Sequence, residues 1–256
     1  MKINEIFFSL QGESTLVGVP TLFIRTYGCN LKCNFCDTVY ARGDLPEGKP
    51  TTGATELVEV SPVEFLEPLP YDDMTSDEII ESIKVDIAGL DKHTLFVCIT
   101  GGEPLMQDHH ELKELCHRLA KLTNNQTLIS IETNGSYPIP WHLPHVYWVI
   151  DIKTPGSGIN MCETDIADLI RSAPDRCEYK FVITGHKDYE WAVDIMRRFI
   201  PKTKIDNRDV IFSPVASEDF PTWPREIADR IVRDKIPVRF QLQLHKVIWP
   251  DKERGV

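Results

Sequence analysis

Three cysteines, Cys29, Cys33 and Cys36, lie close together near the start of the 256-residue chain. At spacings of four and three residues, their thiolates can surround one metal cluster. A structural zinc site needs four closed ligands, and neither a second Cys-x-x-Cys motif nor a His pair follows at zinc-finger distance. A [4Fe–4S] cluster held by three cysteines keeps one iron open, and that iron can bind a small molecule and pass it an electron. The triplet therefore predicts a catalytic iron–sulfur cluster.

The remaining cysteines, Cys98, Cys116, Cys162 and Cys177, are scattered along the sequence. Cys98 and Cys116 fall in apolar patterns that are typical of packed core thiols. In a reducing compartment, a bunched triplet favours metal binding or catalysis over disulfides. The alternative for the triplet is a zinc knuckle with a remote fourth ligand, for which His93 or Cys98 is the candidate.

The composition is typical of a soluble globular protein, with 42% hydrophobic and 26% charged residues. The formal net charge of −11 disfavours nonspecific binding of DNA or RNA, although a local basic pocket is compatible with it. The N-terminal apolar run is too short for a signal peptide, and no stretch approaches the roughly 20 apolar residues of a membrane helix. We therefore expect a cytoplasmic protein that binds neither membranes nor nucleic acid.

Apolar runs alternate with amphipathic segments along most of the chain. Uninterrupted apolar strands suggest burial on both faces, as in a parallel sheet. Because parallel strands end at one edge, the Gly, Thr, Asn and Lys clusters that follow them are expected to share one cleft. The strands are predicted at Thr21–Tyr27, Leu95–Thr100, Thr127–Glu132, Val146–Ile152, Glu178–Ile183, Val210–Phe212 and Val238–Leu244, and the helices at Ser76–Ala88, Asp108–Leu122, Tyr189–Phe199 and Pro224–Lys235. The pattern predicts an α/β fold with a parallel sheet, open or barrel-like.

Residues 39–75 interrupt this alternation. They are rich in Pro, Gly, Thr and acidic residues and show little helical periodicity. We interpret them as an insertion after the cysteine loop, within a single domain that covers residues 1–256. The stretch Glu56–Val60 partly alternates and would suit a short hairpin arm; a solvated loop is the alternative.

Two motifs resemble the radical S-adenosylmethionine (SAM) superfamily. The triplet has the form Cys-x-x-x-Cys-x-aromatic-Cys with Phe35 at the aromatic position, and Gly101-Gly102-Glu103-Pro104 follows a strand as the superfamily's GGEP segment does. Within the superfamily, the chain is similar to the 7-carboxy-7-deazaguanine synthase family. The features that carry this similarity are the N-terminal segment Ile6–Glu13, Arg25, the Cys36-Asp37-Thr38 end of the cluster loop, the Glu132–Gly135 turn and the C-terminal segment Gln241–Lys246.

The resemblance implies a lyase that converts 6-carboxy-5,6,7,8-tetrahydropterin to 7-carboxy-7-deazaguanine with loss of ammonia, in queuosine and 7-deazapurine biosynthesis. SAM would act as a recycled cofactor, whose 5′-deoxyadenosyl radical removes hydrogen from C6 of the pterin and later regains it. The family also implies Mg²⁺, a homodimer and a flavodoxin-like or ferredoxin-like electron donor. The implied fold is a partial, open (β/α) barrel, with residues 39–75 inserted after the cluster loop.

The resemblance also implies which side chains form the site. The cluster would be held by Cys29, Cys33 and Cys36, and Mg²⁺ by the hydroxyl of Thr38. The pterin would be held by Leu10, Gln11, Gly12, Glu13, Arg25, Thr100 and His245. The SAM site would comprise Phe35, Cys36, Asp37, Gly101, Gly102, Glu103, Thr133, Asn134, Asp151, Ile152, Lys153 and Ser213.

The chemistry of these residues agrees with the implied roles. Gln11 and Glu13 can meet the paired donors and acceptors of a pterin edge, and Arg25 offers a bidentate fork to a substrate carboxylate. Mg²⁺ prefers oxygen ligands, so a threonine hydroxyl suits it once substrate and water complete the shell. Structural alternatives remain: Arg25 would pair a buried carboxylate, Lys153 would be a surface charge, and His245 would pack in the core.

Two other functions share parts of the pattern. A glycyl-radical activating enzyme would have the triplet and the GGEP segment but would need a groove for a protein substrate, and the N-terminal Ser-Leu-Gln-Gly-Glu argues against it. A noncatalytic zinc or iron–sulfur module would keep the triplet alone. In some members of the resembled family the C-terminal carboxylate enters the substrate site; because this chain continues through Trp249–Val256, that role is not carried over.

Overall fold

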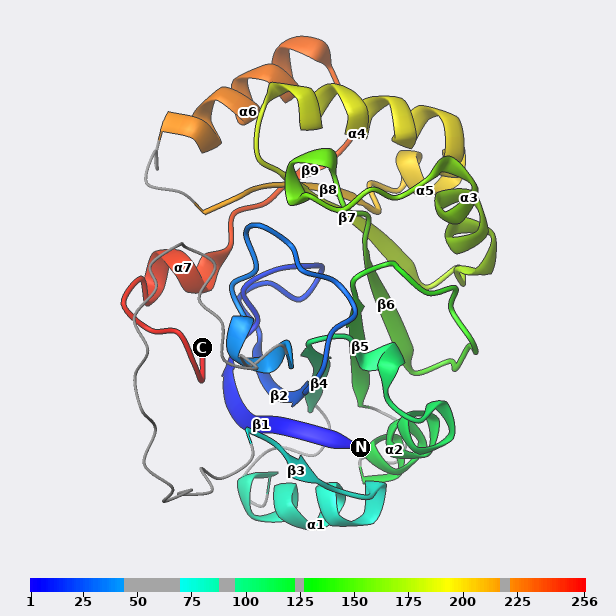
Figure 1. Cartoon of the computed structure of the whole chain (residues 1–256), viewed down its shortest axis with the longest axis vertical. Helices are drawn as coiled ribbons and strands as arrows, with labels where there is room; N and C mark the ends of the chain where they lie inside the picture. Colours follow the sequence, from blue (N-terminus) through cyan, green and yellow to red (C-terminus); the bar gives the residue numbers. More distant parts are fainter. Residues whose placement is uncertain (44–69, 88–94, 123–126, 217–221) are drawn as a thin grey trace, which may run out of the picture.

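The computed structural model describes residues 1–43, 70–87, 95–122, 127–216 and 222–256. Its described strands form one curved sheet in the order β3-β1-β2-β4-β5-β6-β7-β8-β9, with helices on the outer face (Figure 1). β1 pairs antiparallel with β2 on one side and with β3 on the other. All further pairs, from β2–β4 to β8–β9, are parallel. Since β3 and β9 form the two edges, the sheet stays open, and the predicted partial barrel is confirmed.

The elements follow the alternation of the sequence. The strands are β1 (Lys2–Leu10), β2 (Pro20–Thr26), β3 (Asp72–Asp73), β4 (Phe96–Gly101), β5 (Leu128–Thr133), β6 (Val146–Asp151), β7 (Cys177–Ile183), β8 (Val210–Pro214) and β9 (Arg239–Phe240). The α-helices are α1 (Ser76–Ile87), α2 (His109–Leu122), α3 (Glu163–Ser172), α4 (His186–Phe199), α5 (Lys202–Asp206), α6 (Thr222–Asp234) and α7 (Leu244–Ile248), and the 3₁₀ turns are η1 (Val39–Ala41), η2 (Pro104–Met106) and η3 (Pro155–Ser157).

Each parallel strand presents alternate side chains to two different environments. Ile24 and Ile99 are fully buried and point outward, into an apolar core shared with Leu115 of α2 and its helical neighbours. The intervening residues face the barrel interior, and towards the carboxyl ends they are polar, as at Arg25 and Thr100. The outer face therefore stabilises the sheet through hydrophobic burial, and the inner face is left to carry chemistry.

All predicted strands but the last are confirmed to within two residues, and the four predicted helices to within three. β1 and β3 and the helices α3, α5 and α7 were not predicted. In α3 the apolar signal is short, because only Ile166 and Leu169 are fully buried. Within the proposed insertion 39–75, η1 forms the start and β3 the end, whereas Glu56–Val60 lies outside the described residues.

The predicted strand Val238–Leu244 is wrong for most of its length, because β9 covers only its second and third residues and α7 begins at Leu244. Gln241 explains the difference. Its side-chain amide exchanges two hydrogen bonds with the backbone of Ser14, at 2.6 and 2.8 Å. The backbone N–H of Leu244 then donates to the carbonyl of Gly12 at 2.9 Å. These bonds draw the chain away from the sheet and onto the β1–β2 loop.

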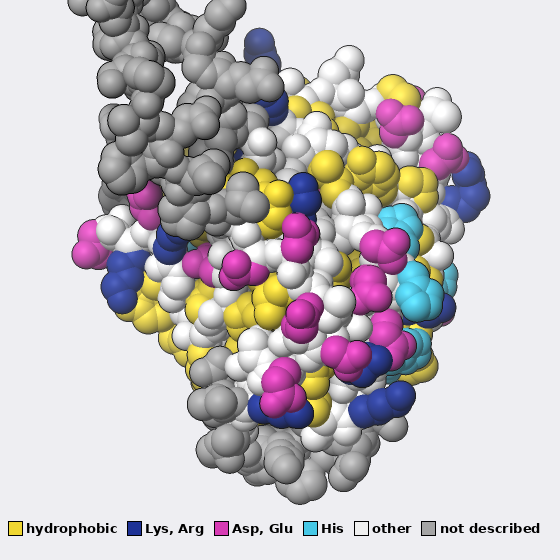
Figure 2. All heavy atoms as spheres, turned by 60° about the horizontal axis from the view of Figure 1, so that its bottom comes forward, with side chains coloured by type: hydrophobic (Ala, Val, Ile, Leu, Met, Phe, Trp, Pro, Cys, Tyr) yellow, Lys and Arg dark blue, Asp and Glu magenta, His cyan; other side chains and the backbone are white. Residues whose placement is uncertain are grey.

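The surface around α1 and α2 mixes acidic and basic side chains, without a continuous basic patch among the coloured residues of this view (Figure 2). This agrees with the net charge of −11. Among the described helices, none is both long and apolar enough to cross a membrane.

Candidate active site

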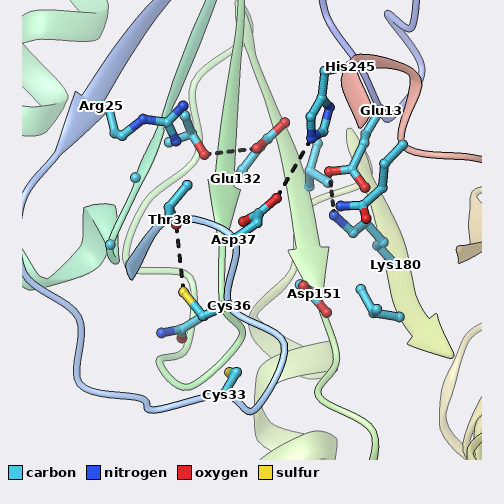
Figure 3. A pocket seen from close by; sticks show the side chains of 18 of the residues that line it. Glu13, Arg25, Cys33, Cys36, Asp37, Thr38, Glu132, Asp151, Lys180 and His245 are labelled. Atoms are coloured by element: carbon cyan, nitrogen blue, oxygen red, sulfur yellow. Dashed lines mark hydrogen bonds and ion pairs between the residues drawn. The ribbon is translucent and has the colours of Figure 1, made fainter. Parts of the chain in front are cut away.

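One open cavity lies at the carboxyl edge of the sheet, where consecutive strands each contribute an inward polar side chain (Figure 3). β2 provides Arg25, β4 Thr100, β5 Glu132, β6 Asp151 and β7 Lys180. Because alternate residues of a strand face the same side and parallel strands end together, side chains far apart in sequence meet here. The expected shared cleft is confirmed.

The loop with Cys29, Cys33 and Cys36 borders this cavity, and all three thiols are half-buried in its wall. The loop packs against the end of β4 at very short range. A Cβ atom added to Gly102 would lie 2.0 Å from the carbonyl oxygen of Gly28, so only glycine fits there. The GGEP segment is therefore the place where the cysteine loop docks on the sheet.

The donor set of the loop fits an iron–sulfur cluster. Thiolates are the soft ligands that such clusters select. The backbone N–H of Leu31 and the side-chain amide of Asn134 lie 3.4 and 3.5 Å from Cys29 Sγ, as outer-shell donors to a ligand sulfur do. No three His, Cys, Asp or Glu side chains among the described residues are arranged to hold a single metal ion. The triplet thus suits a cluster, whose cysteines bind different irons, better than one zinc ion.

Arg25 contacts both a carboxylate and two rings. Its Nε donates to Glu5 Oε1 at 2.6 Å, and its guanidinium lies over Phe7 and Tyr40, at 5.4 and 5.8 Å from the ring centroids. The Tyr40 hydroxyl donates to the same Glu5 oxygen at 3.1 Å, and burial raises the pKa of Tyr40 to about 12. No described residue accepts a hydrogen bond from the Nη atoms of Arg25, which lines the cavity. One edge of the guanidinium is fixed, and the other is available to an anion.

Glu132 connects two residues predicted to hold the substrate. Gln11 Nε2 donates to its Oε1 at 3.1 Å, and Thr100 Oγ1 donates to its Oε2 at 2.9 Å. From the sequence, Glu132 is expected at the end of the strand Thr127–Glu132 and at the start of the turn that follows, with no role in the site. The sequence signal that could have identified Glu132 as a site residue is its carboxylate in a mainly apolar strand. Because a carboxylate is costly to bury without partners, such a residue predicts polar neighbours.

Two lysines with little exposure to solvent form ion pairs in the same wall. Lys153 Nζ lies 2.7 Å from Asp151 Oδ2, and Lys180 Nζ lies 2.8 Å from Glu13 Oε2. Burial lowers the pKa of Lys153, but the charge of Asp151 outweighs it and the net shift is upward. The alternative that Lys153 is a surface charge is wrong, since its side chain is only 11% exposed.

His245 lies in the cavity wall and not in the core. Its Nε2 is 3.7 Å from Asp37 Oδ2, and Lys246 Nζ approaches the same oxygen at 4.0 Å. Partial desolvation in the cavity wall raises the pKa of Asp37, but the nearby imidazole of His245 and the charge of Lys246 hold that pKa well below its usual range. α7 is thereby tied to the end of the cluster loop.

The C-terminal tail, which the sequence analysis left without a role, also reaches the cavity. Glu253 and Val256 line it, and the guanidinium of Arg254 lies 4.2 Å from the ring centroid of Tyr40. The contacts of Gln241 with the β1–β2 loop direct the chain to this place.

Glu103 does not line the cavity, although it was predicted to meet SAM. It is fully buried, and its carboxylate accepts hydrogen bonds from the Thr133 hydroxyl at 2.8 Å and the Asn134 N–H at 2.6 Å. Burial raises the pKa of Glu103, and these donors oppose the shift. The side chain ties the end of β4 to the end of β5. Ile152 and Ser213 are likewise buried behind the cavity wall and not in it.

The other predicted site residues do line the cavity. They are Leu10, Gln11, Gly12, Glu13, Arg25, Cys29, Cys33, Phe35, Cys36, Asp37, Thr38, Thr100, Gly101, Gly102, Thr133, Asn134, Asp151, Lys153 and His245. Lining residues that the sequence analysis did not assign to the site are Phe23, Leu31, Tyr40, Glu132, Val149, Lys180, Val182, Val215, Gln243, Lys246, Glu253 and Val256.

Replacement of Gly12 by alanine is expected to weaken substrate binding without removing the cluster. A Cβ atom there would lie 2.2 Å from His245 Nδ1 and 3.2 Å from the His245 backbone N, so the imidazole and α7 must move. We expect the KM for the substrate to rise about tenfold, the scale of a lost hydrogen bond to a charged group. Gly185→Ala is the control, since a Cβ at Gly185 meets nothing within 4 Å and its backbone is extended. Unchanged KM in Gly12→Ala would contradict the contact.

Comparison with known proteins shows which family the chain is similar to. Residues 23–144 match the family model "Radical SAM superfamily". A 7-carboxy-7-deazaguanine synthase from Chlorobaculum tepidum is 34% identical over 100% of this chain and 97% of its own length, and one from Koribacter versatilis is 32% identical over 100% of both chains. The crystal structure of QueE from Escherichia coli has a TM-score of 0.63 and 22% identity over 95% of this chain and 94% of its own, a likeness that bears on the fold.

The open barrel, the cysteine loop docked on the GGEP segment and the matched model define a radical SAM protein. The similarity to the synthases extends over the whole chain, so it also defines the family within this superfamily. The chain belongs to the 7-carboxy-7-deazaguanine synthase family. This assignment decides against the glycyl-radical activating enzyme and the noncatalytic metal module.

Proposed function

We propose that this chain is a lyase that converts 6-carboxy-5,6,7,8-tetrahydropterin to 7-carboxy-7-deazaguanine with release of ammonia, in queuosine and 7-deazapurine biosynthesis. The observation that carries the proposal is the meeting of the cysteine triplet with Gln11, Glu13 and Arg25 in one cavity of a chain from this family. The cluster would be held by the three cysteines, with SAM beside it. When bound, the reduced cluster and SAM supply the radical that takes hydrogen from C6 of the pterin.

The protein's own residues bind and orient the substrate. Arg25, fixed on one edge by Glu5, offers its other edge to the substrate carboxylate. Gln11, Thr100 and Glu132 form a connected set of donors and acceptors that suits the polar edge of a pterin. The β1–β2 loop and α7 are joined by the hydrogen bond from Leu244 to Gly12 and form one wall of the cavity, which reduces the access of water from that side.

The test is an anaerobic assay of the reconstituted protein with the carboxypterin, SAM and dithionite. We expect product with the absorbance and mass of 7-carboxy-7-deazaguanine, formed only when all components are present. SAM cleavage without any conversion of the pterin would reject the proposed substrate.

We also propose that Thr38 binds Mg²⁺ through its hydroxyl, together with oxygen atoms of substrate and water. Thr38 lines the cavity next to Cys36, with its Oγ1 3.8 Å from Cys36 Sγ. Thr38→Ala is expected to lose most of the activation by Mg²⁺, about tenfold in kcat/KM, because one weak oxygen ligand is removed. Thr38→Ser keeps the hydroxyl and should respond to Mg²⁺ like the parent protein. Equal activation in Thr38→Ala would contradict the role.

We propose further that the chain acts as a homodimer in the cytoplasm and receives electrons from a flavodoxin-like or ferredoxin-like protein. The family resemblance supports the dimer, and the need of an iron–sulfur cluster for a one-electron reductant supports such donors. Sedimentation of the reconstituted protein tests the dimer. Replacement of dithionite by a reduced flavodoxin tests the donor.

A further inference from the structure

The loop between β1 and β2 enters the barrel and is held there from β7. Two inward residues of that strand, Glu178 and Lys180, each bind one residue of the loop. Thr15 Oγ1 donates to Glu178 Oε2 at 2.6 Å, and Lys180 Nζ donates to Glu13 Oε2 at 2.8 Å. The loop that carries Glu13 is therefore positioned by side chains that the sequence analysis did not place in the site.

Lys180 is buried among carboxylates. The residue is 9% exposed, and Glu13, Asp151 and Glu132 all act on its charge. Burial lowers the pKa of Lys180, but the attraction to Glu13 and the other two carboxylates outweighs it and moves the pKa well above its usual range. The ammonium group is charged at any neutral pH.

The two oxygens of the Glu13 carboxylate differ in their surroundings. Oε2 pairs with Lys180, whereas Oε1 is buried and has no hydrogen-bond partner among the described residues. Glu13 lines the cavity, and its side chain extends between the β1–β2 loop and Lys180 (Figure 3). A buried carboxylate oxygen without a donor is unfavourable, because it has lost its hydrogen bonds to water and gained none in return. A ligand that brings an N–H group to Oε1 would remove this penalty.

We infer that Lys180 is a positioning residue for substrate recognition: it fixes Glu13 through Oε2 so that Oε1 accepts an N–H of the substrate's amino-pyrimidinone edge. This inference rests on the proposed function, since that edge belongs to a pterin. It assigns to Lys180 a role in binding and none in cluster assembly or SAM cleavage. Lys180 acts through Glu13 and not by direct contact with the reacting atoms.

The test compares Lys180→Met with Lys204→Met. Lys204 is a matched control, because its side chain is 12% exposed against 11% for Lys180 and it also pairs with a carboxylate, that of Asp209 at 3.3 Å, but it does not line the cavity. We expect Lys180→Met to raise the KM for the carboxypterin about 30-fold with kcat within threefold, the pattern of a lost ground-state contact. Iron content and SAM cleavage without substrate should stay at the level of the parent protein. Lys204→Met should leave the KM unchanged.

Two further variants keep the inference testable. Lys180→Arg retains the charge and should recover most of the affinity. The double variant Glu13→Gln with Lys180→Met removes both charges, so it avoids an unpaired buried carboxylate if Lys180→Met does not fold. Its KM should equal that of Glu13→Gln alone, because the lysine acts only through Glu13.

The outcomes separate the two hypotheses. If the parent protein neither binds nor converts the carboxypterin, the proposed function fails. If the parent converts it and Lys180→Met has an unchanged KM, the inference about Lys180 is overturned alone. Loss of iron and SAM cleavage in Lys180→Met, with no such loss in Lys204→Met, would also overturn it, since the lysine would then support the cluster region.

Discussion

Replacement of Cys29, Cys33 or Cys36 by serine is expected to reduce the iron bound per chain from about four to near zero and to abolish SAM cleavage. The three thiols are the cysteines that line the cavity, and the loop that carries them docks on the glycine end of β4. With one thiolate removed, two protein ligands remain for a cluster that already has an open iron. Iron analysis and 5′-deoxyadenosine formation under dithionite measure both effects.

Cys162→Ser is the matched control. Cys162 is exposed at the start of α3, where its sulfur accepts a hydrogen bond from the Asp165 N–H at 3.4 Å, and it does not line the cavity. Serine is a good N-cap residue, so the fold should tolerate the change. Full iron content in any triplet variant, or its loss in Cys162→Ser, would contradict the assignment of the ligands.

Replacement of Arg25 by glutamine is expected to raise the KM for the carboxypterin about 100-fold, which corresponds to ~2.7 kcal/mol at 1.36 kcal/mol per decade. The guanidinium is buried in the cavity wall and presents its unpaired edge to an anionic substrate. Lysine at this position keeps the charge but not the fork, so Arg25→Lys should recover only part of the affinity. Steady-state kinetics at saturating SAM measure the effect.

A change in stability must be separated from a change in binding in this experiment. Loss of Arg25 leaves the largely buried Glu5 carboxylate with the Tyr40 hydroxyl as its remaining donor, which is expected to lower the stability of the fold. The double variant Arg25→Gln with Glu5→Gln removes both charges and should recover stability but not affinity. Recovery of the KM together with stability would show that Arg25 serves the fold alone.

The sequence predicted the sheet because its strands are apolar runs that end at Gly, Thr, Asn and Lys clusters. It predicted the cluster loop because the cysteine spacing is local. The position of Glu132 and Lys180 in the site was less apparent, although each is a charged residue in an apolar strand. Such a residue signals an inward face near the end of a barrel strand, but the partner that neutralises it comes from a distant segment.

The C-terminal segment could not be predicted for a related reason. Its β-rich pattern favoured a strand up to Leu244, yet the amide of Gln241 binds the backbone of Ser14 and turns the chain into the site. That contact joins residues 227 positions apart, and no local pattern encodes it. Likewise, Glu103 has the motif of a cofactor ligand, but its carboxylate is taken up by Thr133 and Asn134.

The most direct test of the central claim counts product against cofactor. The anaerobic, reconstituted protein is incubated with excess carboxypterin, dithionite, Mg²⁺ and SAM at a tenth of the substrate concentration, and 7-carboxy-7-deazaguanine and 5′-deoxyadenosine are quantified. A recycled cofactor predicts several molecules of product for each molecule of SAM, with little 5′-deoxyadenosine. Absence of the deazaguanine, or a protein that carries one zinc ion and never cleaves SAM, would contradict the account.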